Sequence, residues 1–255
     1  MEKNILLTIQ YDGTNFKGWQ RQPNQRTVQG EIEAALSRLA GHEVLINGTS
    51  RTDRGVHALG QCASFLWNSL IPTEKLPLIL NRRFGAGGIG RREAPGDIRI
   101  LSAREMPPEF HARFSCKGKT YRYIIDRDGD IFHRNMVYQL DEPLDVARMN
   151  EAARYLIGTH DYKSFEAAGG QPRETTVRTI SNFTIEARGT QTVLEVTGDG
   201  FLYNMVRIMV GTLVEIGTGK REPKEMEQIV AAMDRRVAGF TAPPQGLYLK
   251  EIYFE

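Results

Sequence analysis

The sequence has little cysteine and no long hydrophobic run. Cys62 and Cys116 are the two cysteines among 255 residues, and they form no CxxC pair, so no disulfide framework is expected. No apolar stretch approaches the roughly 20 residues that a membrane-spanning helix needs. The first residues lead to only a short apolar run before Tyr11-Asp12-Gly13, which is not the pattern of a signal peptide. These absences predict a cytoplasmic protein without membrane contact.

Familiar metal and nucleophile motifs are also missing. The sequence contains no H-E-x-x-H pair, no G-x-S-x-G elbow and no Walker loop. Five histidines lie far apart, at His42, His57, His111, His133 and His160. The His160-Asp161 dipeptide occurs in some metal sites, but a loop pair before a short strand is the favoured interpretation.

One apparent nucleotide motif is a decoy. Residues 85–90, GAGGIG, fit G-x-G-x-x-G, and they alone would support a nucleotide-dependent oxidoreductase. A dinucleotide site needs a strand before this motif and a helix starting within it. Here a predicted helix precedes the motif and the basic segment 91–96 follows it, so a flexible basic loop is expected.

Charge is distributed unevenly along the chain. The net charge is +2, but residues 1–130 hold 19 Lys and Arg against 14 Asp and Glu, whereas residues 131–255 hold 14 against 17. Most of the excess is arginine, whose planar fork of donors suits phosphate. A solvated basic face without a phosphate partner remains an equal alternative.

The hydrophobic pattern predicts an α+β protein. Helical spacing covers residues 28–39, with Thr27 as N-cap, and a second helix begins after Asp145 and stops at Gly158. Further helices are expected at residues 76–81, 202–216 and 223–233, and strands at 6–11, 44–46, 63–67, 98–101, 121–125, 179–187, 193–197 and 247–253. Few β-α-β alternations occur, so we expect a largely antiparallel sheet with helices on one side. No flexible linker separates the two expected halves, residues 1–130 and 131–255.

An unusual acidic residue lies in residues 48–61, GTSRTDRGVHALGQ. Asp53 stands between Arg51 and Arg54 and is followed two residues later by Gly55. Asp-Arg-Gly is typical of a turn, but a turn aspartate does not require two guanidinium neighbours. The pattern therefore indicates either a turn or chemistry at Asp53.

Arg207 is the only charged residue between Asp199 and Glu215. A helix that is apolar nearly all round is buried, and a buried arginine is seldom unpaired. A carboxylate partner is therefore expected, and Asp53 is the candidate; an arginine whose head reaches water is the alternative.

Tyr121 lies in the predicted strand KTYRYII. Strand alternation puts Tyr121, Tyr123 and Ile125 on one face and Arg122 on the other. Alternating tyrosines usually belong to a core, although an aromatic ring beside a basic edge can stack on a nucleobase.

Several of these segments together resemble the tRNA pseudouridine synthase A family. The matching segments run in the same order through most of the chain: YDGTNFKGWQ (11–20), SRTDRGVHA (50–58), FHARF (110–114), YRY (121–123), GTHD (158–161), FLYNMVR (201–207) and APPQGL (242–247). One departure is an insertion of residues 82–96, which contains four arginines and lies outside these segments.

The resemblance implies a function and a site. This family isomerises uridine to pseudouridine in the anticodon stem-loop of tRNA, at positions 38 to 40. It implies Asp53 as the catalytic carboxylate, Arg207 as its partner and Tyr121 as the residue that stacks on the target base. It further implies a homodimer whose basic cleft holds tRNA, an α+β fold with two pseudo-symmetric halves around that cleft, and no metal or cofactor. Arg51 or Arg54 would fill the gap left by a flipped base. A non-catalytic tRNA-binding protein on the same scaffold is the alternative.

Overall fold

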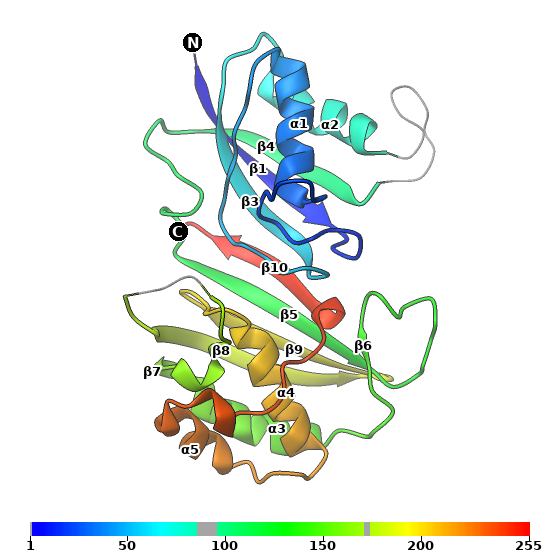
Figure 1. Ribbon diagram of the computed structural model, residues 1–255, viewed down its shortest axis with the longest axis vertical. Helices are drawn as coiled ribbons and strands as arrows, with labels where there is room; N and C mark the ends of the chain where they lie inside the picture. The colour runs from blue at the N-terminus through cyan, green and yellow to red at the C-terminus, as the bar shows by residue number, and fades with distance from the viewer. Residues whose placement is uncertain (1, 86–95, 171–173) are drawn as a thin grey trace. The chain divides into compact units, whose positions relative to one another are not determined.

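The computed structural model describes residues 2–85, 96–170 and 174–255. The chain forms two compact units, one of residues 1–117 with 249–255 and the other of residues 118–248 (Figure 1). The division into halves of residues 1–130 and 131–255 stays a prediction, and the compact units have other bounds.

The sheet of the first unit has the strand order β4-β1-β3-β10. Strand β1 pairs antiparallel with β3 and β4, and β2 pairs antiparallel with β3. Its strands are β1 (Lys3–Tyr11), β2 (Asn47–Gly48), β3 (His57–Trp67), β4 (Ile98–Met106) and β10 (Leu247–Tyr253). Strand β1 is buried along most of its length, with Ile5, Leu6 and Leu7 fully buried. It therefore supplies the centre of this unit's core.

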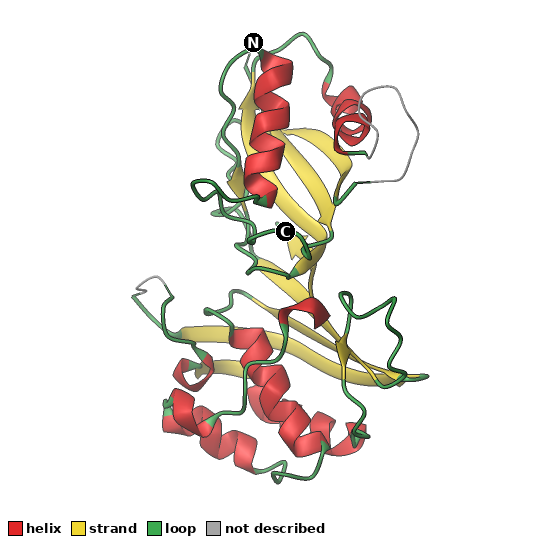
Figure 2. Cartoon of the chain, turned by 45° about the vertical axis from the view of Figure 1, so that its right-hand side comes forward, coloured by secondary structure: helices red, strands yellow, loops and turns green. Residues whose placement is uncertain are grey.

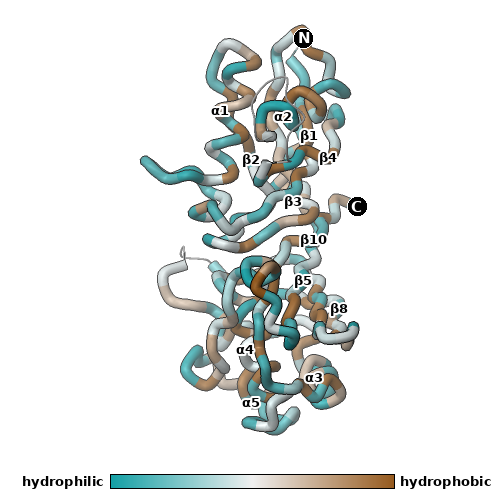
Figure 3. Tube along the Cα trace, turned by 90° about the vertical axis from the view of Figure 1, so that its right-hand side faces the viewer, coloured by the Kyte–Doolittle hydropathy of each residue, from teal (hydrophilic) through white to brown (hydrophobic). Residues whose placement is uncertain are grey.

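Helices α1 (Val28–Ala40) and α2 (Leu76–Phe84) lie against the sheet of the first unit (Figures 1 and 2). Thr27 caps α1, because its side chain accepts a hydrogen bond from the amide of Gly30, and Gly41 ends the helix in the left-handed region. Hydrophobic and hydrophilic residues alternate along α1 (Figure 3), and Val28, Ile32 and Leu36 are buried. A 3-10 helix, Thr73–Lys75, precedes α2.

The second unit has a sheet in the order β5-β9-β8-β7 with antiparallel neighbours, and β6 pairs in parallel with β5. Its strands are β5 (Gly118–Asp126), β6 (Tyr138–Gln139), β7 (Gly158–Asp161), β8 (Val177–Arg188) and β9 (Gln191–Gly198). Helices cover one face of this sheet (Figure 2): α3 (Val146–Ala153), α4 (Met205–Gly217) and α5 (Glu225–Ala232). Short 3-10 helices are Arg154–Leu156, Lys163–Phe165, Arg235–Val237 and Pro244–Gly246.

The α+β class is confirmed, and most predicted elements are present, but the strand predicted at residues 44–46 is wrong. The amide of Ile46 donates to the carboxylate of Glu33 at 3.0 Å, and the amide of Val44 donates to Ser37 Oγ at 2.9 Å. Because side chains of α1 accept hydrogen bonds from these amides, the segment passes beside the helix instead of pairing with another strand.

Helix α4 begins at Met205, three residues later than expected. The preceding residue, Asn204, is in the left-handed region with φ 57°, which interrupts the helical backbone. The core of α4 is otherwise as predicted, since Ile208, Met209 and Val210 are fully buried.

The predicted basic loop lies mostly outside the described residues. Helix α2 ends at Phe84, directly before Gly85, so a helix and not a strand precedes the G-x-G-x-x-G match. Residues 86–95, including Arg91 and Arg92, are among those not described. Within the described ranges, no helix is both long and apolar enough to cross a bilayer.

Candidate active site

The Asp53 loop joins β2 to β3 in the first unit, and its backbone is held from several sides. The amide of Trp19 donates to the carbonyl of Thr52 at 3.0 Å, and the Tyr11 hydroxyl lies 2.7 Å from Thr52 Oγ1. Earlier in the loop, Gln61 Nε2 donates to the carbonyl of Ser50 at 2.7 Å. Ser50 and Thr52, which precede Asp53, are therefore fixed by buried groups.

Glycines allow other segments of the chain to approach this loop closely. A Cβ atom on Gly13 would lie 2.0 Å from the carbonyl oxygen of Val56, and one on Gly18 would lie 2.8 Å from that of Thr52. Gly55 has φ +77°, the left-handed conformation that favours glycine, as expected for the tight turn after Asp53. The amide of Val56 closes this turn on the carbonyl of Asp53 at 3.2 Å.

The loop presents its charged side chains in a definite pattern. Arg51 and Arg54 are exposed, Asp53 is half-buried, and Thr52 between them is buried. A carboxylate flanked by guanidinium groups is favoured in its ionised form. Arg51, Asp53 and Arg54 all lie in this loop of the first unit, and their roles stay predictions.

A second carboxylate, Asp12, lies beside the buried His57 at the start of β3. Nδ1 of His57 is 3.2 Å from Asp12 Oδ1 and 3.0 Å from the amide nitrogen of Gly13. An unprotonated Nδ1 accepts from the amide, whereas a protonated one donates to Asp12. Burial opposes ionisation of Asp12, but hydrogen bonds from His57 and from the hydroxyl and amide of Thr14 outweigh it and lower the Asp12 pKa to about 2.

Arg207 lies in the first turn of α4 in the second unit, half-buried. Its Nε donates to the carbonyl of Ala242 at 2.7 Å, and its Nη1 donates to Asn204 Oδ1 at 2.8 Å. The amide of Ala242 in turn donates to the carbonyl of Arg207 at 3.0 Å. The guanidinium is therefore oriented by fixed acceptors, which the sequence did not predict.

Tyr121 and Tyr123 lie on the same face of β5, and both are buried, as the alternation predicted. Tyr121 meets Phe201 edge-to-face, with ring centroids 5.1 Å apart. The Tyr123 hydroxyl donates to the carbonyl of Pro243 at 2.7 Å. Burial raises the pKa of Tyr123 well above its usual value, although the charge of Arg207 opposes this.

The predicted site residues thus fall into two groups. Asp53, Arg51 and Arg54 belong to the first unit, and Tyr121 and Arg207 to the second. The pairing of Asp53 with Arg207 stays a prediction.

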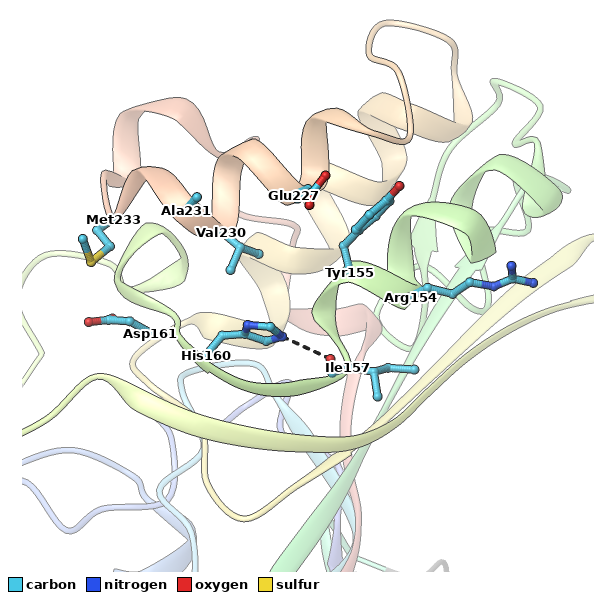
Figure 4. Close-up of a pocket in the computed structure, with 9 residues that line it drawn as sticks. All are labelled: Arg154, Tyr155, Ile157, His160, Asp161, Glu227, Val230, Ala231 and Met233. Carbon is cyan, nitrogen blue, oxygen red and sulfur yellow. Dashed lines mark hydrogen bonds between the residues drawn. The ribbon is translucent and has the colours of Figure 1, made fainter.

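A pocket of about 550 Å³ in the second unit contains none of these residues (Figure 4). It is lined by Arg154, Tyr155, Ile157, His160, Asp161, Glu227, Val230, Ala231 and Met233. His160 Nε2 lies 3.1 Å from the carbonyl oxygen of Ile157, and Asp161 accepts from the hydroxyl of Thr176 at 2.6 Å. Local contacts therefore account for the His-Asp dipeptide. In the described part of the chain, no cluster of three or more His, Cys, Asp or Glu could hold a metal ion.

Comparison with known proteins shows which family the chain belongs to. The model of the tRNA pseudouridine synthase family matches residues 7–115 and 152–255. The chain belongs to this family. Two proteins named tRNA pseudouridine synthase A are close relatives: that of Ruminiclostridium cellulolyticum is 47% identical over 255 residues, and that of Acetivibrio thermocellus is 45% identical over 254 residues. Both alignments cover 99% of this chain and 100% of the relative.

Other similarities are of two kinds. The tRNA pseudouridine synthase A 2 of Clostridium tetani is 45% identical over 258 residues, with full coverage of both chains. A crystal structure of a Cbf5-Nop10-Gar1 complex aligns with 82% of this chain and 54% of that chain at a TM-score of 0.36 and 11% identity, a similarity too low to carry an argument. As a tRNA pseudouridine synthase, the protein is an isomerase that acts on uridines of tRNA.

The Asp53 loop is supported by residues that the sequence pattern did not single out. Tyr11, Gly13, Gly18 and Trp19 all contact the Asp53 loop. The signal that pointed to them was the family-like segment 11–20, to which no role was assigned. Its role is to shape the backbone around Asp53.

Proposed function

We propose that this synthase isomerises uridine at positions 38 to 40 of the tRNA anticodon stem-loop, with Asp53 as the catalytic carboxylate. The observation that carries the proposal is the construction of the Asp53 loop. Buried contacts to Thr52 fix the backbone, while the carboxylate stands between exposed Arg51 and Arg54. A structural turn would not need both the rigid support and the exposed charges.

The chemistry requires an ionised carboxylate. The reaction breaks the C1′–N1 bond, rotates the uracil and joins C1′ to C5, while the proton on C5 is lost and N1 gains one. Positive charge develops at C1′ as the base leaves, as in glycoside cleavage. Asp53 either attacks C1′ and is released when C5 bonds to that carbon, or removes a proton from C2′ and later returns it. Both routes remain open, and both begin with a negative charge on Asp53.

The other predicted residues have supporting roles. The uridine must leave the stacked stem-loop before its C1′ is accessible; Arg51 or Arg54 fills the vacated space, and Tyr121 receives the base. Arg207 pairs with Asp53 and keeps it ionised. The orientation of Arg207 by Ala242 and Asn204 supports this role, because a guanidinium held in place loses little freedom on pairing.

We further propose that two copies of the chain form a homodimer that binds one tRNA across its basic surfaces. The arginine excess of residues 1–130 supports the binding of tRNA phosphates by these surfaces. We also propose that the protein acts in the cytoplasm, where it meets tRNA.

The test is Asp53→Asn in a single-turnover assay with saturating enzyme and tRNA tritiated at C5 of uridine. Asparagine keeps the shape and the turn propensity of aspartate but removes its charge. Tritium release should fall by several orders of magnitude, with an unchanged or smaller Kd for tRNA, because a negative charge has left a phosphate-binding surface.

Glu43→Gln is the matched control, since Glu43 is an exposed carboxylate of the same unit. It should retain wild-type tritium release. Asp53→Asn activity within about tenfold of wild type would return Asp53 to a structural role. Release at wild-type rates from tRNA that lacks uridine at positions 38 to 40 would refute the assigned positions.

A further inference from the structure

The turn at residues 110–115, FHARFS, is part of the first unit and holds two phenylalanines in opposite environments. Phe110 is half-buried and packs on Phe254, with ring centroids 5.0 Å apart. Phe114, four residues later, is 78% exposed. Core packing therefore explains the first phenylalanine but not the second.

The turn is anchored at its centre. Ala112 is fully buried, its amide donates to Ser64 Oγ on β3 at 3.0 Å, and its carbonyl accepts from Thr49 Oγ1 at 3.1 Å. The carbonyl of Phe110 accepts from Asn4 Nδ2 on β1 at 2.7 Å. Thr49 lies four residues before Asp53, so the same segment of chain supports this turn and begins the catalytic loop.

The His111 ring packs against the exposed Phe114 ring. The rings of His111 and Phe114 have centroids 4.4 Å apart and an interplanar angle of 33°. Nδ1 of His111 accepts from the amide of Arg113 at 3.1 Å, and the amide of Phe114 lies 3.4 Å from the same atom. Because Nδ1 is an acceptor here, the neutral ring carries its proton on Nε2. The turn thus fixes the His111 ring, and the His111 ring orients the exposed Phe114 side chain.

A basic group completes the arrangement. The guanidinium carbon of exposed Arg113 lies 6.0 Å from the centroid of the Phe114 ring. A single exposed hydrophobic side chain needs no explanation in itself. An exposed ring that is backed by a second ring, flanked by arginine and built on a rigid turn has the composition of a base-stacking surface. A protein partner would call for a broader apolar patch, but the neighbours Arg113 and Ser115 are polar.

We propose that Phe114, backed by His111, is a stacking platform for an unpaired nucleobase of the substrate RNA, a base other than the one that reacts. Arg113 contacts the adjoining phosphate. The proposal rests on the proposed function, since it assigns a second contact of the same anticodon loop. The FHARF segment would then hold the anticodon loop of the RNA while the target base rotates.

The first experiment is photocrosslinking with anticodon stem-loop RNAs that carry 5-iodouridine at one loop position at a time. Trypsin separates the two rings, because cleavage after Arg104, Arg113 and Lys117 puts His111 in peptide 105–113 and Phe114 in peptide 114–117. We expect the adduct on peptide 114–117 from at least one position other than the reacting uridine. No adduct there from any position would overturn the proposal.

The second experiment measures Kd for the stem-loop with Phe114→Ala and Phe114→Tyr. Base–aromatic stacking corresponds to a loss of about 5- to 150-fold in affinity for Phe114→Ala, whereas Phe114→Tyr should keep wild-type affinity. The dependence of log Kd on log salt should not change for Phe114→Ala, because no phosphate contact is lost, and should become shallower for Arg113→Gln.

Phe132→Ala is the matched control, since Phe132 is 85% exposed in the other unit. Equal affinities for Phe114→Ala, Phe132→Ala and wild type would refute the platform, as would a change of oligomeric state in Phe114→Ala with unchanged RNA affinity. The two proposals fail separately. If the wild-type protein crosslinks through Phe114 but Asp53→Asn releases tritium at the wild-type rate, the catalytic assignment alone is refuted.

Discussion

The hydroxyl of Tyr11 lies 2.7 Å from Oγ1 of Thr52, and both side chains are buried. This contact joins the end of β1 to the residue directly before Asp53. Tyr11 also packs near Trp19, with ring centroids 6.1 Å apart, and the amide of Trp19 holds the carbonyl of Thr52. Thr52 is thus held by both its side chain and its backbone, which limits the positions open to the Asp53 carboxylate.

Tyr11→Phe should destabilise the protein by about 1–3 kcal/mol, because it leaves the buried Thr52 hydroxyl with one partner fewer. Thr52→Val should do the same from the other side. The double variant should lose less than the sum of the two, by about 1 kcal/mol, in a cycle measured by urea unfolding. Strict additivity would show that the two hydroxyls do not interact.

Gly18→Ala should impair catalysis more than Gly41→Ala does. Both glycines have positive φ, +97° and +77°, so both substitutions carry backbone strain of about 1 kcal/mol. A Cβ on Gly18 also meets the Thr52 carbonyl at 2.8 Å, whereas one on Gly41 meets nothing within 4 Å. We expect both variants to lose stability, Gly18→Ala the more because of this clash, and a drop of about tenfold or more in single-turnover rate for Gly18→Ala alone.

Stability at low pH should depend on Asp12. Its folded-state pKa of about 2 is below the ordinary 3.8, so the ionised form contributes stability above about pH 4 that is lost as pH falls towards 2. Asp12→Asn removes this contribution. Urea unfolding at pH 5, 4 and 3 should show the difference between wild type and Asp12→Asn shrinking as pH falls; a constant difference would contradict the lowered pKa.

Arg207→Lys should fold but turn over slowly. Lysine keeps the charge, but its single nitrogen cannot reproduce the directed contacts of Nε with Ala242 and Nη1 with Asn204. Single-turnover rates should fall by about 10- to 100-fold through misplacement of the charge. Arg221→Lys is the control, since Arg221 is also half-buried and binds Glu215 through Nε at 2.6 Å; a similar rate loss there would point to a general structural effect.

The two cysteines should differ in reactivity. Burial raises the pKa of the Cys62 thiol to about 11, despite a hydrogen bond from Thr8 and the charge of Arg104, so it is neither accessible nor ionised near pH 8. Cys116 is partly exposed. A thiol reagent at pH 8 should modify Cys116 in the native protein and Cys62 only after unfolding. Rapid labelling of both in the native state would show that the core around Cys62 opens.

Local patterns in the sequence were sufficient for much of the secondary structure. The period of Val28, Ile32 and Leu36 with the cap at Thr27 predicted α1, because helical amphipathicity and capping depend on residues a few positions apart. The apolar run after Met205 predicted a buried helix for the same reason. The spacing of Arg51, Asp53 and Gly55 also indicated a tight, charged loop, and Gly55 adopts the positive φ that this requires.

Tertiary structure decided whatever depends on residues far apart in the chain. Residues 44–46 have the composition of a strand, but the side chains of Glu33 and Ser37 on α1 accept hydrogen bonds from amides of this segment. No local sequence pattern indicates these partners. Likewise, nothing in residues 11–20 alone shows that Tyr11 and Gly18 shape the Thr52 backbone. The sequence by itself was enough to predict which side chains carry the chemistry, since charge and residue type are local properties. Only the packing of distant segments decided how the Asp53 loop is held, because contacts between such segments form only once the chain has folded.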